Sequence, residues 1–339
     1  MTETVLVTGG TGFVAGWCIV ELLRRGYRVR TTVRSLKKEA EVRAAVAAVA
    51  GDTAGLTFHV ADLTDDAGWD AAMAGCDYVL HVASPLGIDA KADEQALLTP
   101  ARDGTLRILR AATRAAVKRV VMTSAATTAT PLLRGPEGVS DETVWFDPAE
   151  RSVGGYRLSK RAAERAAWDF MQNYRGPTTL TTVLPGAVFG PVLTKENLGS
   201  VQVIARLLQG RMPGMPRLGF EVVDVRDLAD VHIRAMTSPE AAGERFLATG
   251  EFLWMADIAR TLRERLGTVA GKVPTRVLPD FLMRFLSLFD AQLRALVPSL
   301  GRRHRHSIAK AQRLLGWKPR TATETLVDCS NRLIALGLV

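Results

Sequence analysis

Short apolar runs rich in β-branched residues alternate with segments of helical spacing along the first half of the chain. Each run has the length of a buried strand, and none approaches the length that a membrane-spanning helix needs. The predicted strands are residues 4–7, 27–33, 56–60, 77–82 and 119–124. The predicted helices are residues 17–25, 92–117 and 155–170. Strands that alternate with helices predict an α/β fold built on a parallel sheet.

The first strand runs directly into a glycine-rich turn, residues 8–16, and then into the first helix. Glycines permit a tight turn and a close approach of the backbone, and the N–H groups and dipole of a helix N-terminus attract a pyrophosphate. The spacing Gly-x-x-Gly-x-x-Ala differs by one residue from the usual dinucleotide fingerprint. The turn therefore predicts cofactor contacts from Gly9, Thr11, Gly12, Phe13 and Val14.

The end of the second strand indicates which dinucleotide binds. Sites specific for NAD carry an acidic residue there, which binds the ribose 2′-hydroxyl. This chain has Arg34 instead, followed by Lys37 and Lys38. Because a guanidinium matches a 2′-phosphate in charge and geometry, Arg34 and Lys38 predict NADP, bound as NADPH, over NAD. The alternative is that these side chains form a solvated basic loop.

Further cofactor contacts are expected where the third and fourth strands end. Asp62 and Leu63 follow the third strand, where they could meet an adenine amino group. Ala83 and Ser84 follow the fourth strand, and their small side chains would let a cofactor lie against the backbone. His81 lies inside the apolar run, so it is expected to be a packed, hydrogen-bonded histidine rather than a catalytic one.

Tyr156 and Lys160 are the candidate proton donor and its partner. They are four residues apart in a predicted helix, which places both side chains on one face. A phenol is a weak acid at neutral pH, and a neighbouring ammonium favours the phenolate and lowers its pKa. The pair could therefore protonate a carbonyl oxygen that is being reduced to an alcohol. The alternative is that both residues lie on a solvated helix face.

Taken together, these motifs resemble those of the extended short-chain dehydrogenases/reductases. Within that family they are most similar to the group of dihydroflavonol reductases, cinnamoyl-CoA reductases and aldehyde/ketone reductases. The motifs, in the order and spacing of the family, are the turn of residues 8–15, Asp62-Leu63, His81-Val82-Ala83-Ser84-Pro85, Thr123-Ser124 and Tyr156-x-x-x-Lys160. Two later segments, residues 184–191 and 224–232, match the same group.

The resemblance implies a Rossmann-type doubly wound parallel sheet in residues 1–190, completed by about residues 222–250. It also implies a smaller, interleaved substrate region, mainly residues 191–339. Lys160 is expected to hold the nicotinamide ribose hydroxyls in addition to its effect on Tyr156. The resemblance completes the expected cofactor contacts with Val82, Thr123, Tyr156, Lys160, Pro185, Ala187 and Val188.

The chain departs from the family pattern at one position of the active site. The family's carbonyl-binding serine normally follows the Thr-Ser pair at the fifth strand, and Ala125 stands there. The missing hydroxyl could come from Ser124 or Thr127, or be absent. Strand alternation would turn Ser124 to the opposite face, but Ser124 is nearest in sequence, and we assign it the catalytic role beside Tyr156 and Lys160.

Composition narrows the classes of function. The 339 residues are 47% hydrophobic and 23% charged, which suits one large α/β unit with an appendage. Three cysteines without paired spacing indicate neither a disulfide framework nor a metal site, and with no signal peptide expected they favour the cytoplasm. The net charge is +9, but its one dense run, residues 302–306, lacks interleaved aromatics and is interpreted as a solvated loop, so nucleic acid is not expected.

The second half of the chain suggests the kind of substrate. Insertions that face the substrate are expected at residues 85–93, 131–155, 191–221 and much of 252–305. Residues 207–216 are rich in Leu, Met, Pro and Gly, which suits a hydrophobic carbonyl compound. Residues 281–289 space apolar side chains at helical intervals and are expected in the core more than in a pocket.

The sequence thus predicts a monomeric or homodimeric NADPH-dependent reductase of a hydrophobic aldehyde or ketone, with no membrane or metal involved. A nucleotide-sugar epimerase or dehydratase with bound NAD is one alternative, although Arg34 and the apolar loops argue against it. A non-enzymatic NADP-binding regulator is another, although it would not need Tyr156 and Lys160.

Overall fold

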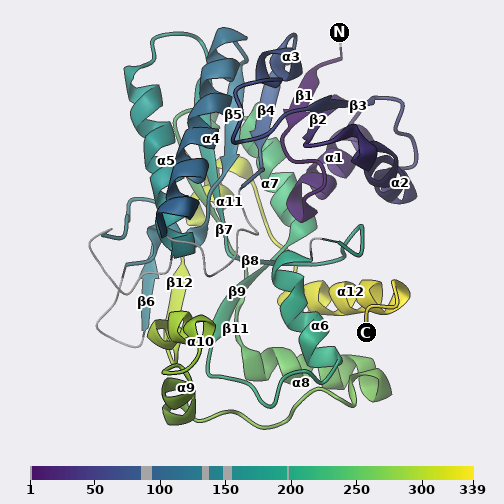
Figure 1. Ribbon diagram of the computed structural model, residues 1–339, viewed down its shortest axis with the longest axis vertical. Helices are drawn as coiled ribbons and strands as arrows, with labels where there is room; N and C mark the ends of the chain where they lie inside the picture. Colours follow the sequence, from purple (N-terminus) through teal and green to yellow (C-terminus); the bar gives the residue numbers. More distant parts are fainter. Residues whose placement is uncertain (1, 85–93, 132–136, 148–154, 197) are drawn as a thin grey trace.

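The computed structural model describes residues 2–84, 94–131, 137–147, 155–196 and 198–339. Its larger part is a seven-stranded parallel sheet, and its smaller part packs below the carboxyl edge of that sheet (Figure 1). The strand order is β10-β7-β5-β4-β1-β2-β3. The order reverses between β1 and β4, where open α/β sheets of this kind bind their ligands. The predicted Rossmann-type doubly wound fold is confirmed.

The bounds of the main sheet lie close to the predicted ones. The strands are β1 (Thr4–Val7), β2 (Arg28–Val33), β3 (Leu56–Val60), β4 (Tyr78–His81), β5 (Arg119–Thr123), β7 (Thr179–Pro185) and β10 (Arg245–Ala248). The helices that cover them are α1 (Phe13–Arg24), α2 (Glu39–Ala50), α3 (Trp69–Met73), α4 (Glu94–Arg114), α5 (Gly155–Asn173), α7 (Val225–Thr237) and α11 (Ala309–Leu315).

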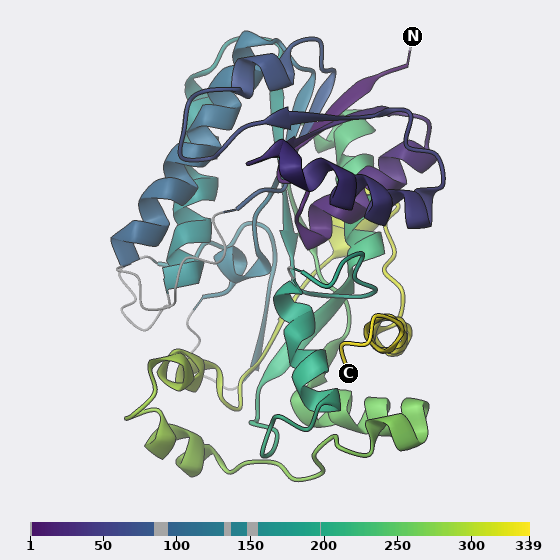
Figure 2. The same ribbon diagram turned by 45° about the vertical axis from the view of Figure 1, so that its right-hand side comes forward.

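Side-chain alternation along the strands builds an apolar layer on each face of the sheet. In β1, Val5 and Val7 pack with α1, α2, α7 and α11, whereas Leu6 packs with α3, α4 and α5 on the other face. Figure 2 shows α4 and α5 on one side of the sheet and the purple α1 and α2 on the other. The β-branched runs therefore form strands because both of their faces are buried.

The smaller part has its own core. A three-stranded sheet, β11-β9-β8, packs with α6, α8 and α12 around buried leucines and methionines. Its elements are β8 (Ala187–Phe189), α6 (Gln202–Leu208), β9 (Gly219–Asp224), β11 (Phe252–Trp254), α8 (Met255–Leu266), α9 (Asp280–Leu286), α10 (Ala291–Leu296) and α12 (Ala322–Ala335). Because α7, β10 and α11 belong to the main sheet and its layers, the chain crosses between the two parts more than once.

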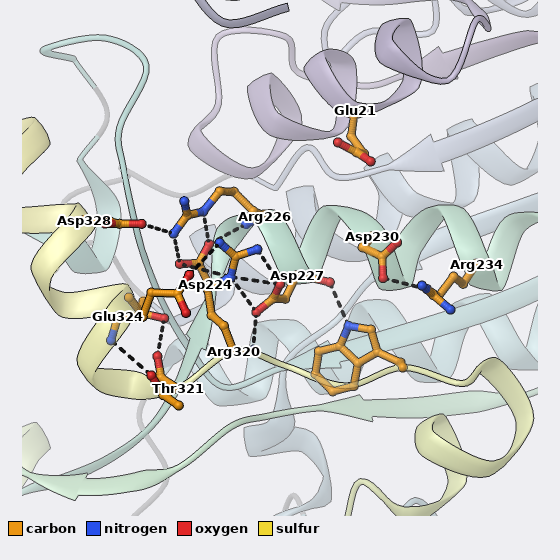
Figure 3. A network of polar contacts seen from close by, with 12 residues as sticks. Glu21, Asp224, Arg226, Asp227, Asp230, Arg234, Arg320, Thr321, Glu324 and Asp328 are labelled. Atoms are coloured by element: carbon orange, nitrogen blue, oxygen red, sulfur yellow. Dashed lines mark hydrogen bonds and ion pairs between the residues drawn. The ribbon is translucent and has the colours of Figure 1, made fainter.

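A network of carboxylates and guanidinium groups fastens the C-terminal segment to α7 (Figure 3). Asp224, whose side chain is fully buried, accepts two hydrogen bonds from the Arg226 guanidinium, which also pairs with Asp328 at 2.7 Å. Arg320 pairs with Asp227 at 2.8 Å, and Trp317 Nε1 donates to the Asp227 carbonyl oxygen at 2.9 Å. The family segment at residues 224–232 therefore anchors the chain end through Asp224, Arg226 and Asp227.

The expectation that residues 281–289 belong to the core is wrong. Only one face of the short helix α9 is covered: Met283 is buried, whereas Phe281 is 75% exposed and Phe289, just beyond the helix, is 79% exposed. The apolar spacing was real, but a helix of seven residues buries only the side chains that face its neighbours.

The expectation of a solvated loop at residues 302–306 is also wrong. Residues Arg303–His306 form strand β12, which pairs in parallel with β6 (Glu137–Ser140). His304 and His306 are partly buried, whereas Arg303 and Arg305 are exposed. The His306 side chain pairs with Glu221 of β9 and bonds Thr130 Oγ1 at 2.8 Å. Partners on distant segments, rather than apolar content, make this strand.

Candidate functional site

The glycine-rich turn after β1 forms the floor of the candidate cofactor site. Gly9 has a φ of +75°, and a Cβ there would meet the Cβ of Ala83 at 3.0 Å. A Cβ on Gly10 would meet Thr31 Oγ1 at 2.5 Å. Gly12 caps α1 without a side-chain hydrogen bond, so the helix N-terminus is open to an anion. These features fit a dinucleotide whose pyrophosphate lies on the turn.

The turn and the end of β4 are fixed to each other by one threonine hydroxyl. Thr8 Oγ1 accepts hydrogen bonds from the backbone N–H groups of Val82 and Ala83, both at 3.0 Å, and therefore donates its proton to His81 Nδ1 at 3.0 Å. Burial lowers the pKa of His81 to about 3, so this histidine is neutral. It has the packed, hydrogen-bonded character that the sequence suggested, and Ser84 follows, partly buried, at the same edge.

The basic side chains after β2 differ in how they are engaged. Arg34 is exposed, and its charge helps to lower the pKa of Asp62, whose main cause is the hydrogen bonds from Thr64. Lys38 Nζ instead pairs with Glu41 at 2.8 Å and with Glu196 at 2.9 Å. Glu196 belongs to the segment after β8, which lines a hollow together with the glycine turn and α2.

The remaining expected cofactor contacts lie at strand ends of the same sheet edge, because all seven strands run in parallel. Asp62 and Leu63 follow β3, where Leu63 receives a hydrogen bond from Arg107 on its carbonyl oxygen. Thr123 ends β5, and its Oγ1 bonds His232 Nε2 at 2.7 Å. At the end of β7 the chain crosses into the second sheet through Pro185, Ala187 and Val188.

Tyr156 and Lys160 lie one turn apart near the start of α5, as the sequence predicts. Tyr156 is 44% exposed, whereas Lys160 is 7% exposed and donates from Nζ to the Thr123 carbonyl oxygen at 3.3 Å. Burial lowers the pKa of Lys160 to about 8, with Glu164 acting in the opposite direction. The helix thus presents a reachable phenol and a sheltered ammonium to the end of β5.

The expectation of a lowered phenol pKa does not hold in this structure. Removal of the Tyr156 hydroxyl from water raises its pKa above the ordinary value, although part of the residue stays exposed. Burial is the cause of this increase in the phenol pKa, while the Lys160 ammonium donates to the Thr123 carbonyl oxygen. Tyr156 is consequently in its protonated form at neutral pH, which is the form that a proton donor requires.

Ser124, to which the sequence analysis assigned the carbonyl-binding role, is directed to a buried carboxylate in this structure. It is 1% exposed, and its hydroxyl donates to Glu164 Oε2 at 2.6 Å. The alternation of β5 has turned it toward the buried side of α5, so its one proton is directed to that carboxylate. Glu164 was not recognised from the sequence, although its spacing of four from Lys160 placed it on the same helix face.

Thr127 is the other hydroxyl considered for that role. It lies in the helical turn at residues 126–129 that follows β5, and its Oγ1 is buried with no hydrogen-bond partner among the described residues. Arg157, the neighbour of Tyr156, donates to the Thr127 carbonyl oxygen at 3.1 Å. The turn therefore lies beside the start of α5.

The part of the chain that the structure describes contains no helix that is long and apolar enough to span a bilayer. It also brings together no group of three or more His, Cys, Asp or Glu side chains suited to a metal ion. The substrate-facing insertion predicted at residues 85–93, and much of the one at residues 131–155, fall outside the described residues.

Comparison with known proteins gives consistent matches over most of the chain. The sequence model of the NAD dependent epimerase/dehydratase family matches residues 5–248. An anthocyanidin reductase from Vitis vinifera is 34% identical over 288 residues, which cover 80% of this chain and 83% of that protein. A cinnamoyl-CoA reductase, CAD2, from Medicago truncatula is 35% identical over 77% of this chain and 80% of its own length.

Solved structures agree with these sequence matches. The yeast methylglyoxal/isovaleraldehyde reductase Gre2, in complex with NADPH, superposes with a TM-score of 0.82. The two proteins are 26% identical, and the match covers 99% of this chain and 100% of the other. The matched relatives are reductases of the resembled group, which confirms the prediction of an NADP-dependent oxidoreductase.

Proposed function

Because the chain belongs to the extended short-chain dehydrogenases/reductases, the NAD dependent epimerase/dehydratase family, we propose that it reduces a hydrophobic aldehyde or ketone with NADPH. The single observation that carries this proposal is the pairing of an open α1 N-terminus with the Tyr156–Lys160 pair at one edge of the sheet. Reductases among the relatives, including one named for methylglyoxal and isovaleraldehyde, support the reaction class.

The proposed cofactor contacts follow from the strand ends. When bound, NADPH supplies the hydride. The turn at residues 9–14 receives its pyrophosphate, and Arg34 and Lys38 its 2′-phosphate. The adenine is expected near Asp62 and Leu63, and the rest of the dinucleotide near Val82 to Ser84, Thr123, Lys160 and the residues Pro185, Ala187 and Val188. The hollow between the glycine turn and α2 supports this course for the phosphates.

Tyr156 is the proposed proton donor. Its phenol holds its proton at neutral pH and part of the residue is exposed, so it can give that proton to the carbonyl oxygen of a bound substrate as negative charge develops there. Lys160 stabilises the resulting phenolate through its positive charge. It is also the residue that we expect to hold the nicotinamide ribose hydroxyls.

We further propose Thr127, rather than Ser124, as the hydroxyl that binds the carbonyl oxygen. Ser124 Oγ already donates to Glu164, and moving it would leave a buried carboxylate with one donor fewer. Thr127 Oγ1 has no described partner and follows the family position, Ala125, by two residues. Its turn lies beside Tyr156 through the contact with Arg157.

The test is NADPH consumption against a panel of aromatic and aliphatic aldehydes, ketones and β-keto esters. We expect turnover with at least one apolar carbonyl compound, and alcohol formation equal to the NADPH consumed. A nucleotide diphosphate-sugar in the same panel tests the epimerase alternative. If the sugar were converted without net consumption of cofactor and no carbonyl compound were reduced, the proposed function would be wrong.

A further inference from the structure

A buried carboxylate lies one helical turn beyond Lys160, at Glu164. Its side chain is completely buried, and it accepts hydrogen bonds from hydroxyl groups directly after β5, on the helical turn that follows and on β7. The donors are Ser124 Oγ at 2.6 Å, Thr128 Oγ1 at 2.8 Å and Thr182 Oγ1 at 2.9 Å. Arg245 of β10 adds an ion pair at 2.9 Å.

Arg245 is itself held from several sides. Its guanidinium stacks on Trp145 at 3.6 Å from the ring centroid, and it donates to the carbonyl oxygens of Glu142 and Val144. The Glu142 side chain in turn accepts from the backbone N–H of Leu247 at 3.0 Å. The Glu164 carboxylate is therefore a fixed charge inside the protein, held by α5, β5, β7 and β10 together.

We infer that Glu164 is a positioning residue for the proposed reduction, which keeps Lys160 charged and holds α5 in register with the end of β5. The inference deepens the proposed function and rests on it. Glu164 and Lys160 are four residues apart on one helix, and their partners are Ser124, which directly follows β5, and Thr123, which ends it. The carboxylate thereby fixes the helix that carries Tyr156 to the strand end that faces it.

The charge on Glu164 matters because the surroundings of Lys160 oppose an ammonium. The titratable groups of neighbouring elements are His81 of β4, His232 of α7, Glu142 and Arg245. Burial lowers the pKa of His81 to about 3 and that of His232 to about 4, so both are neutral where the enzyme would work. The Glu142 carboxylate is engaged by β10. Glu164 favours the Lys160 ammonium, whereas the positive charge of its ion-pair partner Arg245 is expected to oppose it by Coulomb repulsion.

The sign of the effect follows from these charges. Burial lowers the pKa of Lys160 to about 8, and Glu164 limits that decrease. Replacing Glu164 by glutamine removes the favourable charge and leaves that of Arg245 uncompensated, so the ammonium loses its proton at lower pH. Replacing Arg245 as well removes the opposing charge, so part of the decrease in the Lys160 pKa is restored. We therefore expect the Lys160 pKa to be highest in the wild type, lower in Glu164→Gln/Arg245→Met and lowest in Glu164→Gln.

The experiment compares Glu164→Gln, the double variant Glu164→Gln/Arg245→Met, and Asp169→Asn. Asp169 lies on the same helix with its side chain 62% exposed and serves as the matched control. Thermal unfolding and circular dichroism establish that each variant folds. The readouts are the pH profile of kcat with NADPH, and the pKa of Lys160 from NMR titration of its side chain, assigned with Lys160→Arg.

For Glu164→Gln we expect the basic limb of the kcat profile to move down by about one pH unit, roughly a tenfold loss above the limb. Below the limb, kcat should stay within about threefold of the wild-type value, and Asp169→Asn should not move the limb. A basic limb that does not move, or an unchanged Lys160 pKa in a folded variant, would overturn the inference. If the wild type reduces no carbonyl compound, the proposed function fails, and the NMR titration still decides the effect of Glu164 on Lys160.

Discussion

At the scale of single residues, the two hydroxyl groups that follow β5 differ in what surrounds them. Ser124 Oγ is committed to a buried carboxylate, whereas Thr127 Oγ1 has no described partner. A hydroxyl that helps to hold a developing oxyanion is worth on the order of 2–4 kcal/mol of barrier. Replacing Thr127 should therefore change mainly the kinetics, whereas replacing Ser124 should change mainly the stability.

We predict that Thr127→Val lowers kcat/KM by about 10²-fold with little change in thermal stability, because it removes only the carbonyl contact. Ser124→Ala should instead lower stability by roughly 1–3 kcal/mol, since Glu164 loses a donor. Steady-state kinetics and urea unfolding of both variants measure these effects. Ala125→Ser tests whether a hydroxyl at the family position raises kcat/KM. A large kinetic loss confined to Ser124→Ala would return the carbonyl-binding role to that residue.

Arg34 and Lys38 should contribute unequally to the choice of cofactor. Arg34 is exposed and hydrogen-bonds no carboxylate among the described residues, whereas Lys38 must leave Glu41 and Glu196 to reach a phosphate. We predict that NADPH binds about tenfold or more tightly than NADH, and that Arg34→Ala removes most of this preference while Lys38→Ala removes less. Titration of both cofactors checks this. Equal affinities in the unmodified protein would refute it.

At the scale of elements, the local sequence pattern was sufficient to predict strands and helices of the main sheet. The strand predicted at residues 56–60 is β3 with the same bounds, and the Tyr156–Lys160 helix begins at Gly155. The strands are apolar runs whose side chains are buried on both faces of the sheet, and the helices space their apolar side chains so that one face is buried. The helix at residues 13–24 begins earlier than predicted because the end of the glycine turn is already helical.

Strand β12 was missed because nothing local to residues 302–306 requires it. Its residues are charged or polar, and its partner β6 lies more than a hundred residues away in the sequence. Its backbone pairs with β6, and the contacts of His304 with Ser140 and of His306 with Glu221 and Thr130 fix its side chains. In the same way, the hydrogen bonds and the ion pair of Glu164 come from segments far apart in the sequence, so they could not be predicted from local spacing.

A prediction at this scale concerns His306, which joins β12 to β9 and to the turn after β5. His306→Ala leaves the buried Glu221 carboxylate without its side-chain partner, so we expect a loss of about 1–3 kcal/mol in the free energy of unfolding. Arg305→Ala, on the exposed side of the same strand, should change it by less than about 0.5 kcal/mol. Urea unfolding of the two variants is the measurement, and equal effects would show that the histidine contact contributes nothing specific.

At the scale of the whole molecule, two cores are joined around one edge of a sheet. The Asp224–Arg226–Asp328 and Asp227–Arg320 pairs fasten the C-terminal segment to α7, and β12 fastens the smaller part to the loop after β5. The smaller part is thereby held at the carboxyl edge of the main sheet, where the glycine turn follows β1 and Lys160 of α5 contacts the end of β5. The family and the fold were predictable from motif order, whereas the partners of Ser124 and the phenol pKa depended on packing between distant segments.

The central claim is that Tyr156 donates the proton in an NADPH-dependent reduction. It is tested most directly by single-turnover oxidation of bound NADPH in the wild type and in Tyr156→Phe, with a carbonyl compound that the wild type reduces. The substitution removes one oxygen and keeps the ring, so the Kd for NADPH should stay within about threefold while the rate falls by about 10²-fold or more. A near-normal rate in Tyr156→Phe would contradict the account, because another acid would then supply the proton.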